Sequence, residues 1–257
     1  MNPESVLLLP IIAVDFSQRL ILNCYFYFMA ALDKTEQNAE KLAAALAAVK
    51  YVKDGDVVGL GTGSTATLAI EELGKRVKAG LNITAAASSI RTEELAKSYG
   101  IKVLDLGLLS SIDISIDGAD EFTESLDLIK GGGGALFREK IMATLSKNSI
   151  IVTDSSKKVK KLGAFTVPVE VIPLAYQYVF DQIIQLGGKG LLRKADDQTF
   201  ITDNGNYIID ADFGLIDNPA QLNSSLNQIN GVLTSGLFIG LTSKVIMSVG
   251  KELIVFE

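Results

Sequence analysis

The sequence predicts an α/β protein whose doubly wound, mainly parallel sheet carries a second, smaller α+β domain inserted before the last strand. Short apolar runs alternate with helix-like segments from residue 35 to residue 154, as in parallel sheets with helical crossovers. After Lys161 the pattern changes to β-like runs mixed with helices, and an apolar run returns at 236–250. With 257 residues, 48% of them hydrophobic, the chain has enough apolar material for one large or two unequal domains.

Apolar periodicity and glycine stops define the elements of the large domain. In residues 111–117, Ile114 and Ile116 face one side of a strand while Ser115 and Asp117 face the other. Helical spacing predicts helices at 35–52, 66–80, 91–100 and 135–146. The other predicted strands are 57–60, 82–89, 101–106, 127–130 and 149–154, which gives a Rossmann-like alternation of strands and helices.

The small domain is predicted to span residues 165–234, which leaves 29–164 and 235–257 for the large one. Two prolines in the β-like run 165–173 suggest an edge strand or a linker. Residues 199–213 predict a hairpin with Asn204-Gly205 as its turn. The domain's helices are predicted at 176–188 and 218–231, and the final run 236–250 is expected to rejoin the first sheet.

The first 28 residues differ from the rest. Their apolar runs are interrupted by Pro10, Asp15 and Arg19, which argues against a transmembrane span. Glu4 stands where a signal peptide carries positive charge. We expect an extension outside the fold, with Met29 as the true start.

Composition excludes several classes of function. The chain has no histidine, which removes Ser-His-Asp and Cys-His catalysis and His-ligated zinc. Cys24 is the only cysteine, so no internal disulfide forms, as suits a reducing, cytoplasmic setting. A net charge of −6 makes nucleic acid and anionic membrane poor partners, and allows a small anionic ligand where Lys and Arg side chains gather at one site.

The stretch "GLGTGSTA" at 59–66 leads from a strand through glycines into a helix. Helix amides in this geometry attract phosphate. The hydroxyls of Thr62, Ser64 and Thr65 could add to such a cradle, although a tight strand-to-helix turn remains the alternative. The acid of a dinucleotide site is missing after the next strand, where "AAASS" stands.

The stretch "DGADE" places Asp117 at a strand end and Asp120 shortly after it. Paired carboxylates could share protons, hold sugar hydroxyls or bind Mg²⁺. Ordinary turn chemistry explains the same residues. This motif alone leaves the choice open.

The stretch "LIKGGGGALFREKI" joins Lys130 to four glycines and a helix that contains Glu139. Glycines let backbone N–H groups approach a ligand oxygen, and Lys130 adds a full charge, as a developing oxyanion requires. The helical neighbours of Glu139 are apolar, which should raise its pKa toward that of a useful base. The alternative is a surface ion-pair triplet of Arg138, Glu139 and Lys140.

A fourth segment, "TDSSKKVKKLG", follows a strand and brings Lys157 close to the strand end. Lys158, Lys160 and Lys161 fit a solvated cluster. We therefore expect only Lys157 to face the cleft.

Seven motifs stand in order between residues 36 and 250: "GLGTGSTA", "SSIRTEELAKSYG", "IDGADE", "LIKGGGGALFREKI", "DSSK", "VPVEVIP" and "TDNGNY". With them the chain resembles A-type ribose-5-phosphate isomerases. The resemblance implies interconversion of ribose 5-phosphate and ribulose 5-phosphate without metal or cofactor, by a homodimer or homotetramer, in the non-oxidative pentose phosphate pathway.

The resemblance also implies residue roles. Glu139 would move the proton between C1 and C2, Asp117 would help to open the ring and handle hydroxyl protons, and Lys130 with the glycine amides would stabilise the enediolate. Asp120 is placed with these catalytic residues and also with the substrate contacts. The other implied substrate contacts are Lys41, Thr62, Gly63, Ser64, Thr65, Gly118, Ala119, Gly131, Gly132, Gly133 and Lys157.

Three other functions remain as alternatives. A sugar-phosphate sensor domain would keep the "GTGST" cradle without needing the base. A CoA transferase would use a Glu nucleophile but needs a basic CoA groove, and a dehydrogenase lacks its ribose-binding acid.

Overall fold

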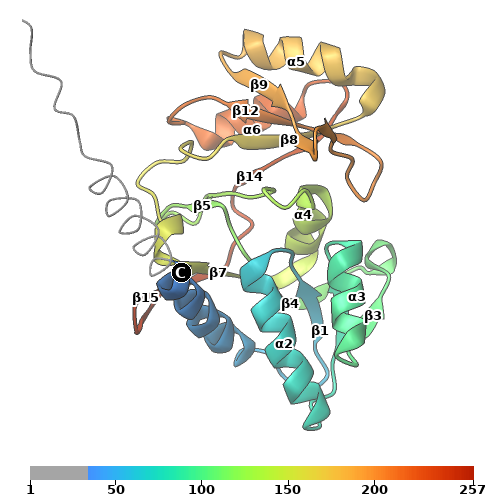
Figure 1. Cartoon of the computed structure of the whole chain (residues 1–257), viewed down its shortest axis with the longest axis vertical. Coiled ribbons are helices and arrows are strands. Elements are labelled where there is room, and N and C mark those ends of the chain that lie inside the picture. Colours follow the sequence, from blue (N-terminus) through green and yellow to red (C-terminus); the bar gives the residue numbers. More distant parts are fainter. Residues whose placement is uncertain (1–33) are drawn as a thin grey trace, which may run out of the picture.

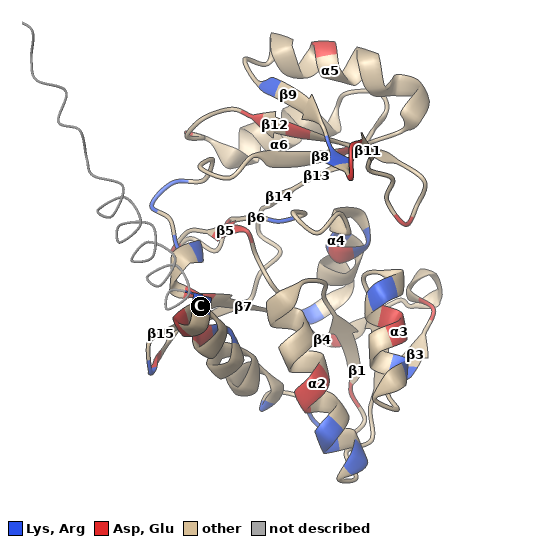
Figure 2. Cartoon of the chain, in the orientation of Figure 1, with Lys and Arg blue, Asp and Glu red and all other residues tan. Residues whose placement is uncertain are grey.

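The computed structural model describes residues 34–257 (Figure 1). The expected extension 1–28, the expected start at Met29 and Cys24 lie outside this range. Within residues 34–257 no helix is both long and apolar enough to span a bilayer. Lys and Arg residues are interspersed with Asp and Glu residues on both domains (Figure 2).

A seven-stranded sheet organises the large domain. Its strands follow the order β16-β15-β7-β4-β1-β2-β3, and every neighbouring pair is parallel except β15 with β16. Their bounds are β1 Val57–Leu60, β2 Thr84–Ala87, β3 Lys102–Leu104, β4 Ile112–Asp117, β7 Ser146–Asp154, β15 Lys244–Val249 and β16 Glu252–Phe256. The predicted mainly parallel, doubly wound class is confirmed.

Helices cover the two faces of this sheet. One buried cluster joins the helix at residues 34–49 and helices α2 and α3 to apolar side chains of the sheet, including Ile114 and Ile116. Helix α4 packs against the other face, where Gly59 leaves room for Met142 beside Ser115. The helix bounds are α2 Ser64–Lys78, α3 Ile90–Ser98 and α4 Leu136–Leu145, with short 3₁₀ turns η1 Leu106–Leu108 and η2 Ser155–Lys157.

A four-stranded antiparallel sheet, ordered β13-β8-β12-β9, forms the core of the small domain. Its elements are β8 Val167–Val171, η3 Pro173–Ala175, α5 Tyr176–Gln185, β9 Lys189–Leu192, β12 Tyr207–Asp212, α6 Pro219–Asn227 and β13 Val232–Ser235. Residues 165–234 remain the proposed extent of this domain. The expected edge strand or linker at 165–173 is wrong, because β8 is interior and pairs with β12 and β13. The β13 ladder ends at the pair Ser235–Val169, so no ladder hydrogen bond needs the missing N–H of Pro168, although Pro168 O still accepts from Gly236 N at 2.6 Å.

The predicted hairpin at 199–213 is also wrong. The strand before the turn, β11 Gln198–Thr199, pairs with β10 Lys194–Ala195, while β12 joins the four-stranded sheet. The turn itself exists, since Gly205 N donates to Thr202 O and Gly205 has φ 77°. The turn predicted at Asn204-Gly205 is therefore confirmed, but it lies in a loop that joins strands of two different sheets, β11 and β12.

A small sheet connects the two domains. Its strands β5 Glu121–Phe122, β6 Leu128–Ile129 and β14 Leu237–Phe238 follow the order β14-β6-β5. The final run 236–250 therefore splits, because β14 joins this sheet and only β15 rejoins the large one. Residues 130–135 leave this sheet and lead into α4.

Candidate active site

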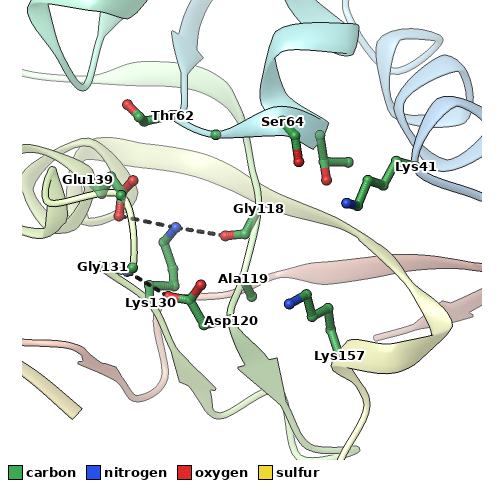
Figure 3. A pocket seen from close by; sticks show the side chains of 14 residues that line it. Lys41, Thr62, Ser64, Gly118, Ala119, Asp120, Lys130, Gly131, Glu139 and Lys157 are labelled. Carbon is green, nitrogen blue, oxygen red and sulfur yellow. Dashed lines mark hydrogen bonds and ion pairs between the residues drawn. The ribbon is translucent and has the colours of Figure 1, made fainter. Parts of the chain in front are cut away.

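A cavity of about 150 Å³ lies at the carboxyl ends of β1, β4 and β7 (Figure 3). All the residues predicted for the site line it except Asp117, which lies behind Lys130. The lining residues are Lys41, Thr62, Gly63, Ser64, Thr65, Gly118, Ala119, Asp120, Lys130, Gly131, Gly132, Gly133, Glu139 and Lys157. Ligands of open α/β sheets bind at this edge.

The loop after β1 enters α2 through Gly63, whose φ of 106° favours glycine. No side chain caps this end of α2. The first backbone N–H groups of the helix are therefore left without a side-chain acceptor where Ser64 and Thr65 line the cavity. Such a helix end carries partial positive charge and suits an anion.

The Thr62 hydroxyl belongs to a cluster of hydroxyls. Its Oγ1 lies 2.7 Å from Ser88 Oγ, 3.0 Å from Ser89 Oγ and 3.2 Å from Thr92 Oγ1. This cluster joins the β1–α2 loop to the start of α3. The hydroxyl thus has protein partners already, and its expected contact with a ligand remains a proposal.

Asp117 ends β4 and is 4% exposed. Its Oδ1 accepts hydrogen bonds from Thr62 N at 3.2 Å and Gly118 N at 2.7 Å. Gly61 permits this arrangement, because a Cβ at that position would stand 2.0 Å from Asp117 Oδ1. The backbone therefore fixes one oxygen of the carboxylate and leaves Oδ2 facing Lys130.

Lys130 joins two buried carboxylates. Its Nζ lies 3.0 Å from Asp117 Oδ2 and 3.2 Å from Glu139 Oε2, and it donates a 2.7 Å hydrogen bond to Gly118 O. Asp117 Oδ2 and Glu139 Oε2 are both buried, and neither has a hydrogen bond of good geometry in the described chain. They are close enough to the ammonium for electrostatic attraction yet retain unused hydrogen-bonding capacity.

Burial and charge set the protonation of this cluster. Burial raises the pKa of Glu139 to about 8, the negative charge of Asp117 adds to the rise, and Lys130 opposes it. Burial likewise raises the pKa of Asp117 against the effect of Lys130. Burial alone would lower the pKa of Lys130, but the two carboxylates outweigh it and hold the ammonium charged.

The four glycines serve different purposes. Gly131 and Gly134 have φ values of 103° and 81°. Gly132 N donates to Asp120 Oδ2 at 2.7 Å, and a Cβ on Gly132 would meet that carboxylate. Gly134 N donates to Gly131 O. Within residues 34–257 only the amides of Gly131 and Gly133, of these four glycines, donate to no atom, and both glycines line the cavity.

Two lysines stand at the end of the cavity away from Glu139 (Figure 3). Lys41 Nζ lies 3.9 Å from Asp154 Oδ2, and Lys157 comes from η2. Neighbouring Glu40 ties Lys41's helix down, because it accepts from Ser155 N at 2.9 Å and Gly250 N at 2.6 Å. This end thus combines two cations with the N-terminus of α2.

Sequence reasoning missed Arg193, which comes from the small domain. Its Nη1 donates to Gly131 O at 2.7 Å and Gly132 O at 3.2 Å, while its Nε donates to Asp210 at 2.9 Å. Arg193 therefore binds the glycine segment to the small domain through the carbonyl oxygens of Gly131 and Gly132. The only local signal was the basic pair Arg193-Lys194 after the apolar run "GLL".

Within the described residues no group of three or more His, Cys, Asp and Glu side chains is placed to hold a metal ion. In the Asp117–Asp120 pair, for which Mg²⁺ was one option, Asp117 Oδ1 and Asp120 Oδ2 accept from backbone amides, and Asp117 Oδ2 lies 3.0 Å from Lys130 Nζ.

Comparison with known proteins gives a consistent result. A sequence model of the family Ribose 5-phosphate isomerase A (phosphoriboisomerase A) matches residues 84–252. Proteins named Ribose-5-phosphate isomerase A from Sphingopyxis alaskensis and Bacillus mycoides are each 47% identical, over 78% and 82% of this chain and 88% and 95% of their own lengths.

Solved structures agree. Ribose 5-phosphate isomerase A from Methanocaldococcus jannaschii superposes with a TM-score of 0.81 at 42% identity, covering 84% of this chain and 97% of that one. A D-ribose-5-phosphate isomerase in complex with phospho-erythronic acid gives 0.83 at 36% identity, covering 86% and 99%. By sequence and by structure, the chain belongs to the ribose 5-phosphate isomerase A family and is an isomerase.

Proposed function

We propose that this protein interconverts D-ribose 5-phosphate and D-ribulose 5-phosphate through an enediolate, with Glu139 as the base. Family membership supports the substrate. One observation carries the mechanism: the buried carboxylate of Glu139 faces the Lys130 ammonium at 3.2 Å on the wall of a cavity. The cavity volume, about 150 Å³, falls below the roughly 300–1,000 Å³ of pockets for drug-sized ligands and suits a small sugar phosphate.

The polarity of the cavity suggests how the substrate lies. The phosphate would sit between the N-terminus of α2, Lys41 and Lys157, where positive charge gathers. The sugar would then extend toward the other end, so that C1 and C2 reach Glu139 and Lys130. Asp120, Gly118 and Ala119 lie between the two ends and would contact hydroxyls.

The reaction would proceed by one proton transfer in each direction. With the sugar ring open, the Glu139 carboxylate removes the proton on C2, the C–H electrons form the C1–C2 double bond, and negative charge develops on O1. Lys130 stabilises that charge, with the free N–H groups of the glycine segment. Glu139 then returns the proton to C1, and the proton of the O2 hydroxyl passes to O1 through Asp117, which gives the ketone at C2 and a hydroxyl at C1.

Asp117 would handle hydroxyl protons. Its raised pKa, caused first by burial, brings proton exchange closer to neutral pH. Its Oδ2 also has no aligned hydrogen bond in the described chain. It could therefore accept a proton from a sugar hydroxyl during ring opening and during collapse of the enediolate.

The decisive experiment is a coupled assay of ribulose 5-phosphate formation with EDTA present and CoA absent. We expect turnover by the wild type and, for Glu139→Gln, a loss of at least the roughly 10²–10⁴-fold that a general base supplies. Near-normal turnover by Glu139→Gln would remove Glu139 from its role. A requirement for metal or CoA would count against the proposed reaction.

The cellular setting follows from the same proposal. The reaction would belong to the non-oxidative pentose phosphate pathway in the cytoplasm, carried out by a homodimer or homotetramer. Light scattering coupled to size exclusion would measure the oligomeric state.

A further inference from the structure

The two charged neighbours of Glu139 do not behave as the surface triplet that was one sequence alternative. Within the described chain no ion pair joins Glu139 to Arg138 or Lys140. Glu139 is 3% exposed and faces the cavity, while Arg138 and Lys140 each reach a different segment outside α4. The three side chains therefore point away from α4 in different directions, Glu139 into the cavity and the other two to separate segments of the chain.

Lys140 contacts the segment where the chain returns from the small domain. Its Nζ donates to Ser235 O at 2.6 Å and Leu237 O at 2.9 Å, and lies 4.7 Å from the centre of the Phe238 ring. Burial lowers the pKa of Lys140 to about 8, as expected of a cation withdrawn from water.

The same return segment also holds the partner of the base. Lys130 N donates to Gly236 O at 2.9 Å, between the two carbonyls that Lys140 binds. Lys130 and α4 are thus attached to three consecutive residues, 235–237. This shared attachment links the backbone of Lys130 to the helix that carries Glu139.

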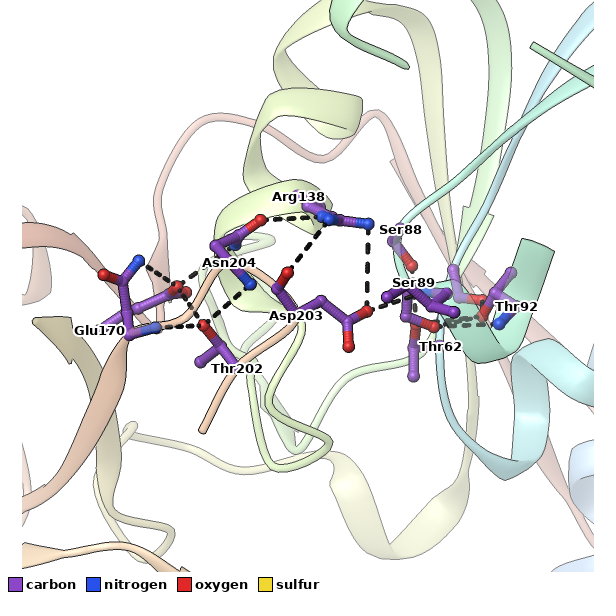
Figure 4. A network of polar contacts seen from close by, with 12 residues as sticks. Thr62, Ser88, Ser89, Thr92, Arg138, Glu170, Thr202, Asp203 and Asn204 are labelled. Carbon is purple, nitrogen blue, oxygen red and sulfur yellow. Dashed lines mark hydrogen bonds and ion pairs between the residues drawn. The ribbon is translucent and has the colours of Figure 1, made fainter. Parts of the chain in front are cut away.

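Arg138 contacts the 202–206 turn of the small domain (Figure 4). Its Nε donates to Asn204 Oδ1 at 3.0 Å, and Nη1 lies 4.0 Å from Asp203 Oδ2. Asp203 Oδ2 also accepts from Ile90 N at 2.8 Å, at the start of α3. The turn therefore joins α4 to the helix whose hydroxyls surround Thr62.

The inner side of this turn is firmly anchored. Glu170, from interior strand β8, is fully buried. Its Oε1 accepts from Thr202 Oγ1 at 2.9 Å, Asn204 Nδ2 at 3.3 Å and Asn206 Nδ2 at 3.0 Å. Arg138 consequently binds a turn whose inner side is hydrogen-bonded to the core of the small domain.

We propose that Arg138 and Lys140 are positioning residues for the isomerase reaction: by tying α4 to the 202–206 turn of the small domain and to the return segment 235–237, they fix the Glu139 carboxylate against Lys130 and the reacting carbons. This inference rests on the proposed function of Glu139. Proton transfer requires near-contact geometry, and a displacement of about 1 Å can cost on the order of 10²-fold in rate. The phosphate contacts lie at the far end of the cavity on other elements, so substrate binding should suffer less than turnover.

The test compares Lys140→Met and Arg138→Met with Lys140→Arg and Arg138→Lys in the full-length protein. The methionine variants remove the donors but keep an apolar side chain of similar length. We expect kcat to fall about 10–100-fold for Lys140→Met and less for the more exposed Arg138→Met, with KM changed less than threefold. The Arg and Lys variants should recover part of the lost kcat.

A second readout separates positioning from mere stability. With ribose 5-phosphate deuterated at C2, a misplaced base makes proton transfer more rate-limiting, so the isotope effect on kcat should rise in both methionine variants. Asp217→Ala, which removes the exposed ion pair between Asp217 of the small domain and Lys161, is the matched control and should leave kcat, KM and the isotope effect unchanged.

The outcomes are distinct. Unchanged kcat and isotope effect in both methionine variants, with an active wild type, would overturn this inference alone. A fall in kcat that merely follows a loss of folded protein, measured by circular dichroism at the assay temperature, with a wild-type isotope effect, would also overturn it. An inactive wild type would overturn the proposed function and this inference together.

Discussion

The buried carboxyl of Glu139 should make the protein less stable as pH rises, and Glu139→Gln should remove that dependence. Burial raises the pKa of Glu139 from its ordinary 4.5 to about 8. Between these values the folded protein keeps the proton and the unfolded chain releases it. Stability from this group is therefore fully present below pH 4.5 and is lost as pH rises to 8.

The magnitude follows from proton linkage. Each pKa unit corresponds to about 1.4 kcal/mol, so wild-type stability should lose on the order of 4 kcal/mol between pH 4.5 and pH 8 from Glu139 alone. Glutamine carries no such proton. The difference in unfolding free energy, variant minus wild type, should therefore grow by about 1.4 kcal/mol per pH unit in this window and level off above pH 8.

Urea unfolding followed by circular dichroism at pH 5, 6, 7, 8 and 9 and at one protein concentration measures this difference. Glu124→Gln is the control, because Glu124 is exposed and its ion pair with Lys158 lowers its pKa. Its difference from wild type should stay constant between pH 6 and pH 8. A constant difference for Glu139→Gln as well would refute the assignment of a raised pKa to Glu139.

Three further outcomes are expected. Because the base must be unprotonated, kcat/KM of the wild type should rise with pH to a plateau above about 8, and a profile that is flat from pH 6 to 9 would contradict a titrating Glu139. Gly61→Ala should lower kcat at least tenfold and destabilise the protein by about 1–3 kcal/mol, because the new Cβ would displace Asp117. A wild-type kcat together with a wild-type free energy of unfolding in urea would exclude this clash. Lys157→Ala and Lys41→Ala should raise KM more than they lower kcat and weaken competitive inhibition by inorganic phosphate, whereas unchanged KM in both would place the phosphate elsewhere.

Local sequence patterns predicted most of the large sheet and the segments that meet at the cavity, whereas Lys41, Gly118 and Ala119 were predicted through the family resemblance alone. The alternation in 111–117 fixes which side chains of β4 share a face, so Asp117 could be assigned to the opposite face from Ile116. Parallel strands bring their carboxyl ends to one edge, so the segments after β1, β4 and β7 could be expected to meet. These inferences need only the period of a strand and the direction of the chain.

The failures have a different physical origin. The missing N–H of Pro168 led to the prediction of an edge strand or a linker. Whether a proline fits inside a sheet depends on where the neighbouring strand, here β13, stops pairing. The contacts of Arg193 with Gly131 and of Lys140 with Ser235 join residues 62 and 95 positions apart. Such partners are set by the packing of two domains, and no local periodicity contains them.

Because the sequence has no histidine, the proposed base is a carboxyl whose pKa depends on its charged neighbours. A solvated carboxylate is too weak a base at neutral pH, and full burial without compensation would keep the carboxyl protonated. Burial raises the pKa of Glu139, and Lys130 limits the rise, so the group titrates near pH 8. Lys130 can keep its charge beside Glu139 because Asp117 supplies a second negative charge at 3.0 Å. In the proposed mechanism, Asp117 therefore matters as much as Lys130 for the pKa of Glu139.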